Sequence, residues 1–457
     1  MGTAVETAQP VRGSNLYAQR VNPQWVRLLD LLEMNVRYER CVGAELFTAD
    51  GRRIVDFLSG YCVHNVGHNH PDVVRALQGE LARSGPAMIQ THAADLAGEL
   101  AGKLCAGAGG RLSKAFFASS GSEGVEAAIK FARAHTRRSG ILAAEHAFHG
   151  LTCGALSLMS DAFWREGFGP LMPETAVVPF GSMEALEAEL KRKRFAAFIV
   201  EPIQSEAGVR IPARDYLRGA EALCRRYGTL FVLDEVQTGM YRTGTFLAAH
   251  QFAVNPDMVV LAKALSGGLV PVGAVLMSDE VCESVYSSLP RALLHTSTFS
   301  ENSLAMRAGL ATLAVLERES LGQRALKAGD YLREQLTTAL AKFEMVKEVR
   351  GMGLLMGIEF QAPKQLRLRV PYEAFGTIHA GMFGQILVMR LFRDFGFLTQ
   401  VCGNNFMVLK VAPPLVVERG QMDAFVVALR NVIQLANSPG AFWSEALGLA
   451  RRAFRAH

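Results

Sequence analysis

The sequence of 457 residues is poor in cysteine, has little excess charge of either sign, and contains no long apolar run. The net charge is +5 and basic side chains are interleaved with acidic ones, which argues against nucleic-acid binding. The seven cysteines lie far apart without a CxxC pair and are odd in number, as expected of free thiols in a reducing cytoplasm. Because the N-terminus lacks the apolar core of a signal peptide and no stretch approaches ~18 uninterrupted apolar residues, we expect a cytoplasmic protein without a membrane-spanning helix.

Apolar residues make up half of the sequence, which is the composition of a well-buried globular enzyme. The length exceeds the ~250–300 residues that one core usually serves, so two domains are expected. We assign residues 1–75 to an N-terminal arm and part of a small domain, and residues 76–325 to a large domain. Residues 326–457 should form the rest of the small domain with an extra terminal helix.

Short apolar runs alternate with segments of helical periodicity through the middle of the sequence. The runs predict strands at residues 114–118, 141–144, 176–180, 196–200, 230–233, 258–261 and 273–277. The segments between them predict helices, among them residues 123–135, 182–191 and 213–227. Runs that are apolar throughout, and therefore buried on both faces, predict an α/β fold with a mostly parallel sheet.

The two ends of the sequence predict a smaller α+β domain. A short helix is expected around residues 25–34, followed by two strands between residues 45 and 58 around the turn Asp50-Gly51. Further on, the expected helices are residues 304–342, 375–395 and 442–454. The expected strands between them are residues 346–349, 354–360 and 408–411.

Four polar motifs follow expected strands, which is where open α/β sheets bind their ligands. The first is Ser119-Ser120-Gly121-Ser122-Glu123, whose small residues and free amides at a helix N-terminus could seat a phosphate. Ser120 and Glu123 also have the spacing of a capping box, which would start a helix without any ligand.

The second and third motifs are Phe148-His149-Gly150 and Asp234-Glu-Val-Gln237. Phe148 could stack on a planar heteroaromatic cofactor, although a core position is the simpler explanation for an isolated phenylalanine. A carboxylate such as Asp234, placed opposite a pyridine nitrogen, keeps that nitrogen protonated. Acids at the end of a strand could instead hold magnesium, but no GxxxxGK[ST] element precedes them.

The fourth motif places a lysine at the end of an apolar strand, where Lys263 precedes Ser266-Gly-Gly268. A lysine amine forms an imine with an aldehyde cofactor, and partial burial lowers the pKa of the lysine for that purpose. Taken alone, a solvated lysine at a strand end would be the ordinary explanation.

Together these motifs resemble those of the class III aminotransferases of PLP (pyridoxal 5′-phosphate) fold type I, with ornithine aminotransferase the most similar pattern. The resemblance extends over roughly residues 45–435. The stretches that carry it are Phe57-Leu-Ser-Gly-Tyr61, Gly67-His-Asn-His-Pro71, Gly167-Phe-Gly-Pro170, Glu201-Pro-Ile-Gln-Ser-Glu206-Ala-Gly208, Asp234-Glu-Val-Gln-Thr-Gly239, Lys263-Ala-Leu-Ser-Gly-Gly268 and Ala412-Pro-Pro-Leu415. The resemblance implies a transaminase that binds PLP in its large domain, acts on small-molecule amines and carbonyl compounds, needs no metal, and forms a homodimer with shared active sites.

The resemblance also implies a role for each motif residue. Lys263 would hold the cofactor as a Schiff base and then move the proton between substrate and cofactor carbons, while Asp234 would pair with the pyridine nitrogen. Glu201 would lie behind the cofactor as a structural acid or have a plain capping role. The other cofactor-binding residues would be Gly121 and Ser122 at the phosphate, Phe148 and His149 at the ring, Gln237 near the phenolic oxygen, and Thr298 at the phosphate of the neighbouring subunit. The substrate-binding residues would be Tyr61, Glu206 and Lys410.

Two substitutions depart from the family pattern. Where relatives have an arginine that binds the substrate α-carboxylate, this sequence has Lys410, which cannot offer a bidentate planar fork but could still pair with Glu206. A second carboxylate-binding arginine of ornithine aminotransferase is replaced by Leu151, although Arg40 could compensate. We therefore expect the carbonyl substrate to be an aldehyde or ketone with an apolar or polyol body.

Two further segments suit a lipid-like substrate, and each has an alternative explanation. The insertion at residues 361–389 could wall an apolar tunnel or pack a dimer interface. The expected last helix is basic and amphipathic, so it could touch a membrane surface or pack on its own subunit. Transaminases that resemble this sequence act in the synthesis of hopanoid side chains and on alkyl aldehydes of prodigiosin-type pathways. The alternative functions are a racemase or aminomutase on the same fold, an ornithine or acetylornithine aminotransferase, and a non-enzymatic binding protein.

Overall fold

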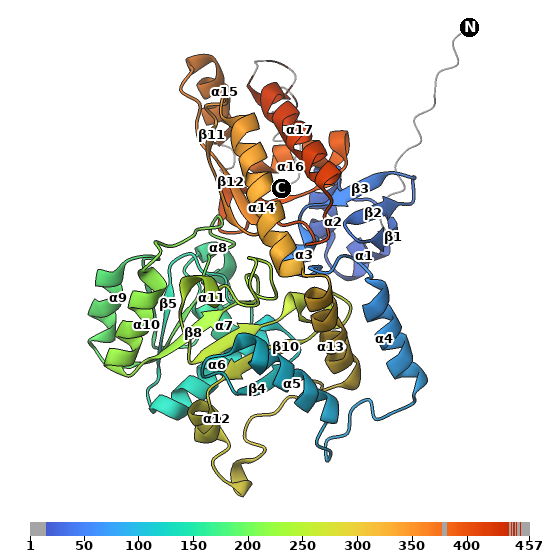
Figure 1. Cartoon of the computed structure of the whole chain (residues 1–457). Helices are drawn as coiled ribbons and strands as arrows, with labels where there is room; N and C mark the ends of the chain where they lie inside the picture. The colour runs from blue at the N-terminus through green and yellow to red at the C-terminus, as the bar shows by residue number, and fades with distance from the viewer. Residues whose placement is uncertain are drawn as a thin grey trace.

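The computed structural model describes residues 15–376 and 382–437, together with Gly440, Phe442, Trp443, Glu445 and Gly448. These residues form a large domain around one sheet and a smaller domain around two sheets. In Figure 1 the smaller domain lies above the large domain. Most of the expected last helix, and with it the expected membrane-surface contact, lies outside the described residues. No helix in the described part of the chain has the length and apolar character that crossing a membrane requires.

A seven-stranded sheet forms the centre of the large domain, in the order β4-β10-β9-β8-β7-β5-β6. Its strands are β4 (Lys114–Ala118), β5 (Gly140–Ala144), β6 (Thr175–Val178), β7 (Phe195–Val200), β8 (Leu230–Asp234), β9 (Met258–Leu261) and β10 (Gly273–Met277). β10 runs antiparallel to β4 and β9, and the remaining neighbours pair in parallel. The prediction of an α/β fold with a mostly parallel sheet is therefore confirmed.

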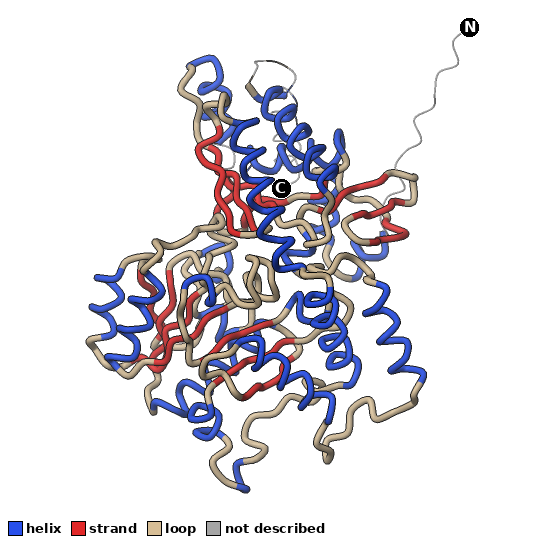
Figure 2. The backbone as a smooth tube through the Cα atoms, viewed as in Figure 1, coloured by secondary structure: helices blue, strands red, loops and turns tan. Residues whose placement is uncertain are grey.

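Helices and loops enclose this sheet, as the tube in Figure 2 shows. The helical segments of the large domain are α4 (Pro71–Ala82), α5 (Asp95–Ala108), α6 (Gly121–Thr136), α7 (Cys153–Ser157), α8 (Ala162–Arg165), α9 (Met183–Leu190), α10 (Tyr216–Tyr227), α11 (Ala249–Phe252), η1 (Lys263–Ser266), α12 (Asp279–Val285), η2 (Leu289–Arg291) and α13 (Ser303–Arg318). In α6 the Ser120 hydroxyl accepts a hydrogen bond from the Glu123 amide at 3.2 Å, which caps the first turn. The small buried face of α6, with Ala128 and Ala132, lets the helix pack closely on the sheet.

The smaller domain is built from both ends of the chain. Its first sheet contains β1 (Tyr38–Val42), β2 (Glu45–Thr48), β3 (Arg53–Asp56) and β13 (Phe397–Leu398), and β2 and β3 form the hairpin expected around Asp50-Gly51. Its second sheet contains β11 (Val346–Met352), β12 (Leu355–Phe360), β15 (Asn405–Val411) and β14 (Gln400–Cys402), in that order. The remaining helices are α1 (Asn15–Arg20), α2 (Pro23–Leu31), α3 (Ser59–Cys62), α14 (Leu321–Leu340), α15 (Leu366–Gly376), α16 (Met382–Phe395) and α17 (Arg419–Ala436).

One helix that the sequence predicts as continuous is divided in the structure. The prediction of one helix over residues 304–342 is wrong because Ser320 adopts a left-handed φ of 51°, which ends α13 and separates it from α14. The helix expected at 375–395 is present as α16 from Met382 to Phe395, and residues 377–381 lie outside the described residues. Inside the small domain Phe383 is buried and stacks on Trp443 with 6.2 Å between ring centroids.

A fully buried arginine joins the two domains. The Arg242 guanidinium donates hydrogen bonds to the carbonyl oxygens of Leu354, at 3.0 Å, and Pro413. It also donates to the side-chain oxygens of Ser59, at 3.1 Å, and Asn65. Burial lowers the pKa of Arg242, yet a guanidinium remains charged in proteins. Among the described residues its hydrogen-bond partners are all neutral oxygens.

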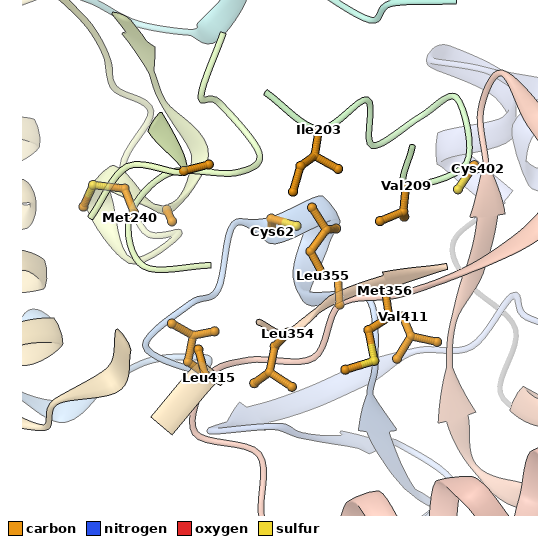
Figure 3. Close-up of a cluster of buried hydrophobic side chains, with 14 of the residues drawn as sticks. Cys62, Ile203, Val209, Met240, Leu354, Leu355, Met356, Cys402, Val411 and Leu415 are labelled. Carbon is orange, nitrogen blue, oxygen red and sulfur yellow. The ribbon is translucent and has the colours of Figure 1, made fainter. Parts of the chain in front are cut away.

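Apolar side chains from the same chain segments gather at this junction, as Figure 3 shows for Cys62, Met240, Leu354 and Leu415. Each of them is almost completely buried. The Arg242 hydrogen bonds therefore lie in surroundings where an unpaired polar atom is costly.

Replacing Arg242 by methionine should lower the free energy of unfolding by at least about 3 kcal/mol, because each buried acceptor left without a donor costs about 1–3 kcal/mol. Urea unfolding followed by circular dichroism measures the change. The matched control is Arg218→Met, which removes an exposed ion pair with Asp215 and should change the free energy by less than about 1 kcal/mol. Equal, small effects of the two substitutions would contradict a stabilising role for the buried guanidinium.

Candidate active site

A cavity of about 540 Å³ lies at the carboxyl ends of the central strands. Loops that follow five strands of the sheet contribute to its wall. The expected cofactor-binding residues that line it are Gly121, Ser122, Phe148, His149, Asp234, Gln237 and Lys263, and Glu201 lines it as well. The fold thus brings into one cavity residues that lie as far as 142 positions apart, from 121 to 263.

Lys263 is the first residue of η1, directly after the loop that leaves β9. Its φ of 48° is left-handed, which is unusual for a lysine and characteristic of strained functional positions. Burial lowers the pKa of the Lys263 ammonium, and the negative charge of Glu206 opposes this lowering only in part. A larger fraction of the amine is therefore neutral and nucleophilic than on an exposed lysine.

Asp234 and His149 form a buried pair at the bottom of the cavity. Oδ2 of Asp234 lies 2.8 Å from Nδ1 of His149, and Oδ1 accepts a hydrogen bond from the Val236 amide at 3.1 Å. Burial opposes protonation of His149, but the hydrogen bond and charge of Asp234 outweigh it and raise the pKa of the imidazole. The hydrogen bond to His149 fixes the orientation of the Asp234 carboxylate, which lines the cavity.

The neighbouring acid of the same motif, Glu235, points elsewhere. Its carboxylate accepts hydrogen bonds from the amides of Ala248 at 3.0 Å and Ala249 at 2.8 Å, and from the Thr238 hydroxyl. Asp234 therefore lines the cavity, whereas Glu235 binds the buried backbone at residues 248 and 249. Within the described part of the chain no group of three or more His, Cys, Asp or Glu side chains could hold a metal ion.

Glu201 supports the loop that carries Phe148. Its carboxylate accepts hydrogen bonds from the amide of Phe148 at 2.9 Å and the amide of Ser205 at 3.2 Å. Burial raises the pKa of Glu201 to about 7, although the neighbouring His149 lowers it. These contacts are those of a capping residue, one of the two roles considered for this glutamate.

The start of α6 has the geometry of a phosphate seat as well as a helix cap. Gly121 and Ser122 occupy its first turn, where backbone amides have no partner within the helix. A side chain on Gly121 would meet Val236 at 3.0 Å, and one on Gly150 would meet the Ser122 hydroxyl at 2.1 Å. Small residues are therefore required on both sides of the expected phosphate.

A second buried ion pair lies beyond Gln237. The Lys410 ammonium donates a hydrogen bond to the Glu206 carboxylate, which also accepts from the Gln237 side chain at 3.0 Å and the Gly403 amide at 2.8 Å. Burial alone would raise the pKa of Glu206, but Lys410 lowers it to about 2. The pKa of Lys410 is raised because the charge of Glu206 outweighs the cost of burial. Both groups are therefore ionised, and the pair expected as possible from the sequence is present.

Tyr61 lies over this pair, with its ring centroid 5.2 Å from the Lys410 ammonium. It belongs to α3, in which four successive residues have left-handed φ values, from 46° at Ser59 to 69° at Cys62. The turn is held by Asp56, whose carboxylate accepts hydrogen bonds from the amides of Leu58 at 2.8 Å and Ser59 at 2.7 Å. The strained turn thus places the tyrosine ring over the ion pair, and none of Tyr61, Glu206 and Lys410 lines the cavity of Lys263.

Thr298 is the one expected cofactor-binding residue that the structure leaves away from this cavity, among those described. It lies on an exposed loop beside a second cavity of about 530 Å³, where its carbonyl oxygen accepts a hydrogen bond from Gln90 at 3.1 Å. Arg40 stacks on Phe47, 4.0 Å from the ring centroid, and does not line the cavity of Lys263. No described residue of the 361–389 insertion lines that cavity either.

Three contributors to the site were missed in the sequence. An apolar wall of Leu269-Val-Pro-Val272 lines the cavity, and its run of apolar residues after Gly267-Gly268 was the available signal. Trp164 packs edge-on against Phe148, with 5.3 Å between ring centroids, and hydrogen-bonds Asn404 at 2.7 Å. Neither of these two residues has a motif that would have indicated its place.

Comparison with known proteins shows the family of this chain. The family model described as aminotransferase class-III matches residues 30–433. Aminotransferase PigE from Serratia sp. (strain ATCC 39006) is 34% identical over 462 residues, which covers 94% of this chain and 54% of that protein. The chain thus spans about half the length of this curated relative.

Solved structures of ornithine aminotransferases have the same fold. The enzyme from Toxoplasma gondii ME49 superposes with a TM-score of 0.79 at 28% identity, over 93% of this chain and 99% of that one. The Plasmodium falciparum ornithine delta-aminotransferase superposes with a TM-score of 0.73 at 30% identity, over 88% of this chain and 94% of that one. The family model that matches residues 30–433, together with the relative that is 34% identical over 94% of the chain, shows that this chain belongs to the class-III aminotransferases of fold type I, transaminases that work with pyridoxal 5′-phosphate.

Proposed function

We propose that this transaminase takes an amino group from glutamate or a terminal amine and passes it to an aldehyde or ketone with an apolar body. The observation that carries this proposal is the closed Glu206–Lys410 pair. Lys410 is fully buried and its positive charge is already compensated by Glu206. The ammonium therefore attracts a substrate carboxylate only weakly. A hopanoid side-chain aldehyde is one member of the proposed class.

The surroundings of the cavity support an apolar acceptor. Leu269, Val270 and Val272 line one wall, and Leu151 is 54% exposed at the position where ornithine aminotransferase has an arginine. An alkyl chain that packs on an apolar wall is removed from water, which favours its binding. The same wall offers a carboxylate no hydrogen-bond partner, so burying a carboxylate there is costly.

The residues of the cavity divide the chemical work. Bound pyridoxal phosphate supplies an electron-withdrawing ring that lets an amino group leave one substrate carbon and join another. Lys263 provides the amine that binds the cofactor and afterwards carries the proton between reacting carbons. Asp234, hydrogen-bonded to His149, would pair with the ring nitrogen and keep it protonated. Gly121 and Ser122 would hold the phosphate, Phe148 would cover one face of the ring, and Gln237 would lie near the phenolic oxygen.

We propose further that two copies of this chain form a homodimer in the cytoplasm and share their active sites. The loop of Thr298 is exposed and carries uncovered apolar side chains, with Leu289 90%, Leu293 80% and Phe299 62% exposed. Such a patch is typical of a protein interface. In the dimer Thr298 would reach the cofactor phosphate of the partner.

Replacing Lys263 by alanine should reduce turnover by at least about 10²–10⁴-fold, the range for loss of a positioned acid–base group. Borohydride should fix the cofactor covalently to the unmodified protein and not to the variant, as mass spectrometry of peptides would show. The control is Lys191→Ala, an exposed lysine of the large domain that should leave both results unchanged. Full turnover in the Lys263→Ala variant would refute the proposed chemistry.

The acceptor proposal predicts that decanal reacts with the pyridoxamine form of the enzyme at a higher kcat/KM than 2-oxoglutarate. Lys410→Arg should raise kcat/KM for 2-oxoglutarate by roughly tenfold, because a bidentate fork adds about 1.4 kcal/mol of carboxylate binding. The same substitution should not raise the value for decanal, which serves as the internal control. An unmodified enzyme that accepts only short polar keto acids would rule out the apolar acceptor.

Shared active sites predict complementation between two inactive variants. Thr298→Asp should weaken phosphate binding in the partner site by charge repulsion, and Lys263→Ala should inactivate its own site. When the two variants are unfolded together and refolded, mixed dimers should regain activity, since one of their two sites then has both residues intact. Activity that stays at the level of the separate variants, with mixed dimers present by mass spectrometry, would mean that Thr298 does not serve the partner.

A further inference from the structure

The turn between β14 and β15 brings the small domain into contact with the active site. Its two residues Gly403 and Asn404 reach from the small-domain sheet to loops of the large domain. None of the four motifs that predicted the site includes this turn, and in the described residues it does not line the cavity of Lys263. Its hydrogen bonds nevertheless reach Glu206 directly and Phe148 through Trp164.

The side-chain amide of Asn404 has both of its ends engaged. Its Oδ1 accepts a hydrogen bond from the indole Nε1 of Trp164 at 2.7 Å. Its Nδ2 donates to the carbonyl oxygens of His146 at 2.8 Å and Ala147 at 3.3 Å, directly before Phe148. The asparagine amide supplies both a donor and an acceptor. A carboxylate of similar size would lack the donor, and a hydrocarbon side chain would lack both.

The backbone of the same turn binds Glu206. The Asn404 amide donates to the Glu206 carbonyl oxygen at 2.9 Å, and the Gly403 amide donates to the Glu206 carboxylate at 2.8 Å. A side chain on Gly403 would lie 3.2 Å from this carboxylate and 3.3 Å from the Trp164 ring. The turn therefore fits closely between the substrate-facing acid and the indole.

Trp164 completes the connection to the cofactor face. Its ring packs edge-on against Phe148, at an interplanar angle of 79°, and Asn404 holds the indole through its N–H. We propose that Asn404 is a positioning residue that joins Glu206, at the substrate end, to Phe148, at the cofactor ring. Through these contacts the side chain fixes the height of the Phe148 ring and couples it to the state of the Glu206–Lys410 pair. This inference rests on the proposed function in one respect, the stacking of Phe148 on the cofactor.

The test compares Asn404→Asp with Asn405→Asp. The aspartate at 404 keeps the acceptor for Trp164 but places a carboxylate against the carbonyl oxygens of His146 and Ala147. Asn405, the first residue of β15, is the matched control, because the one hydrogen bond of its side chain among the described residues is to the Met407 amide of its own strand, at 3.2 Å. Both variants add the same charge, at neighbouring positions.

Two readouts on the PLP-loaded protein report on Phe148 and not on general stability. They are the visible circular dichroism of the bound PLP and the rate at which dialysed protein loses PLP. Asn404→Asp should change the dichroic band and release PLP roughly tenfold faster, the effect of about one buried hydrogen bond lost. Asn405→Asp should match the unmodified protein in both. An unchanged band and release rate in Asn404→Asp, or equal changes in the two variants, would overturn the proposal.

A double-mutant comparison tests the coupling to Glu206 separately. Glu206→Gln should alter the dichroic band in the unmodified background and alter it less when Asn404 is replaced by leucine. If the two effects simply add, Asn404 does not connect the two ends. Should the aspartate and leucine variants fail to fold, Trp164→Phe removes the indole N–H while keeping an aromatic ring, and an unchanged band in that variant would overturn the proposal. Because PLP retention and dichroism need no acceptor, these results are independent of the acceptor assignment.

Discussion

The packing of the two domains against each other depends on one buried positive charge, that of Arg242, whose hydrogen-bond partners among the described residues are all neutral oxygens. Arg242 donates hydrogen bonds to oxygens from the α3 turn, the segment after it, the residue before β12 and the segment after β15. Four stretches of the small domain are thereby fixed to one guanidinium of the large domain. Val63, which lies between Ser59 and Asn65 in the sequence, lines the cavity of Lys263, so the same hydrogen bonds hold part of the cavity wall.

Two buried pairs of side chains lie in and beside the cavity and differ in what they leave open to a ligand. Asp234 is hydrogen-bonded to His149 and still lines the cavity, where a ring nitrogen would complete its surroundings. Lys410 and Glu206 instead pair with one another away from the cavity lining, and Gln237 and the Gly403 amide also donate hydrogen bonds to the carboxylate. The first pair leaves a carboxylate open to a ligand and the second does not, because the charges of the second pair compensate each other.

Backbone strain is concentrated at the same place. Lys263 and Tyr61 have φ values of 48° and 61°, in a region that costs a residue with a side chain roughly 1–2 kcal/mol. The Asp56 carboxylate and the packed loops around η1 hold these conformations against that cost. The reactive amine and the substrate-facing ring are thus preorganised before any ligand arrives.

The sequence by itself determined the approximate positions of the seven central strands, the mostly parallel α/β fold and the motifs that come to line the cavity. These features follow from apolar periodicity and from motifs of a few neighbouring residues, which act locally. The sequence could not predict the break between α13 and α14, because helical periodicity continues through Ser320 and only its left-handed backbone ends the helix. Tertiary structure alone decided that Lys410 is closed against Glu206, that Arg242 joins the domains and that Asn404 touches the active site. Each of these depends on burial and on contacts between residues far apart in the chain, such as the 204 positions between Glu206 and Lys410.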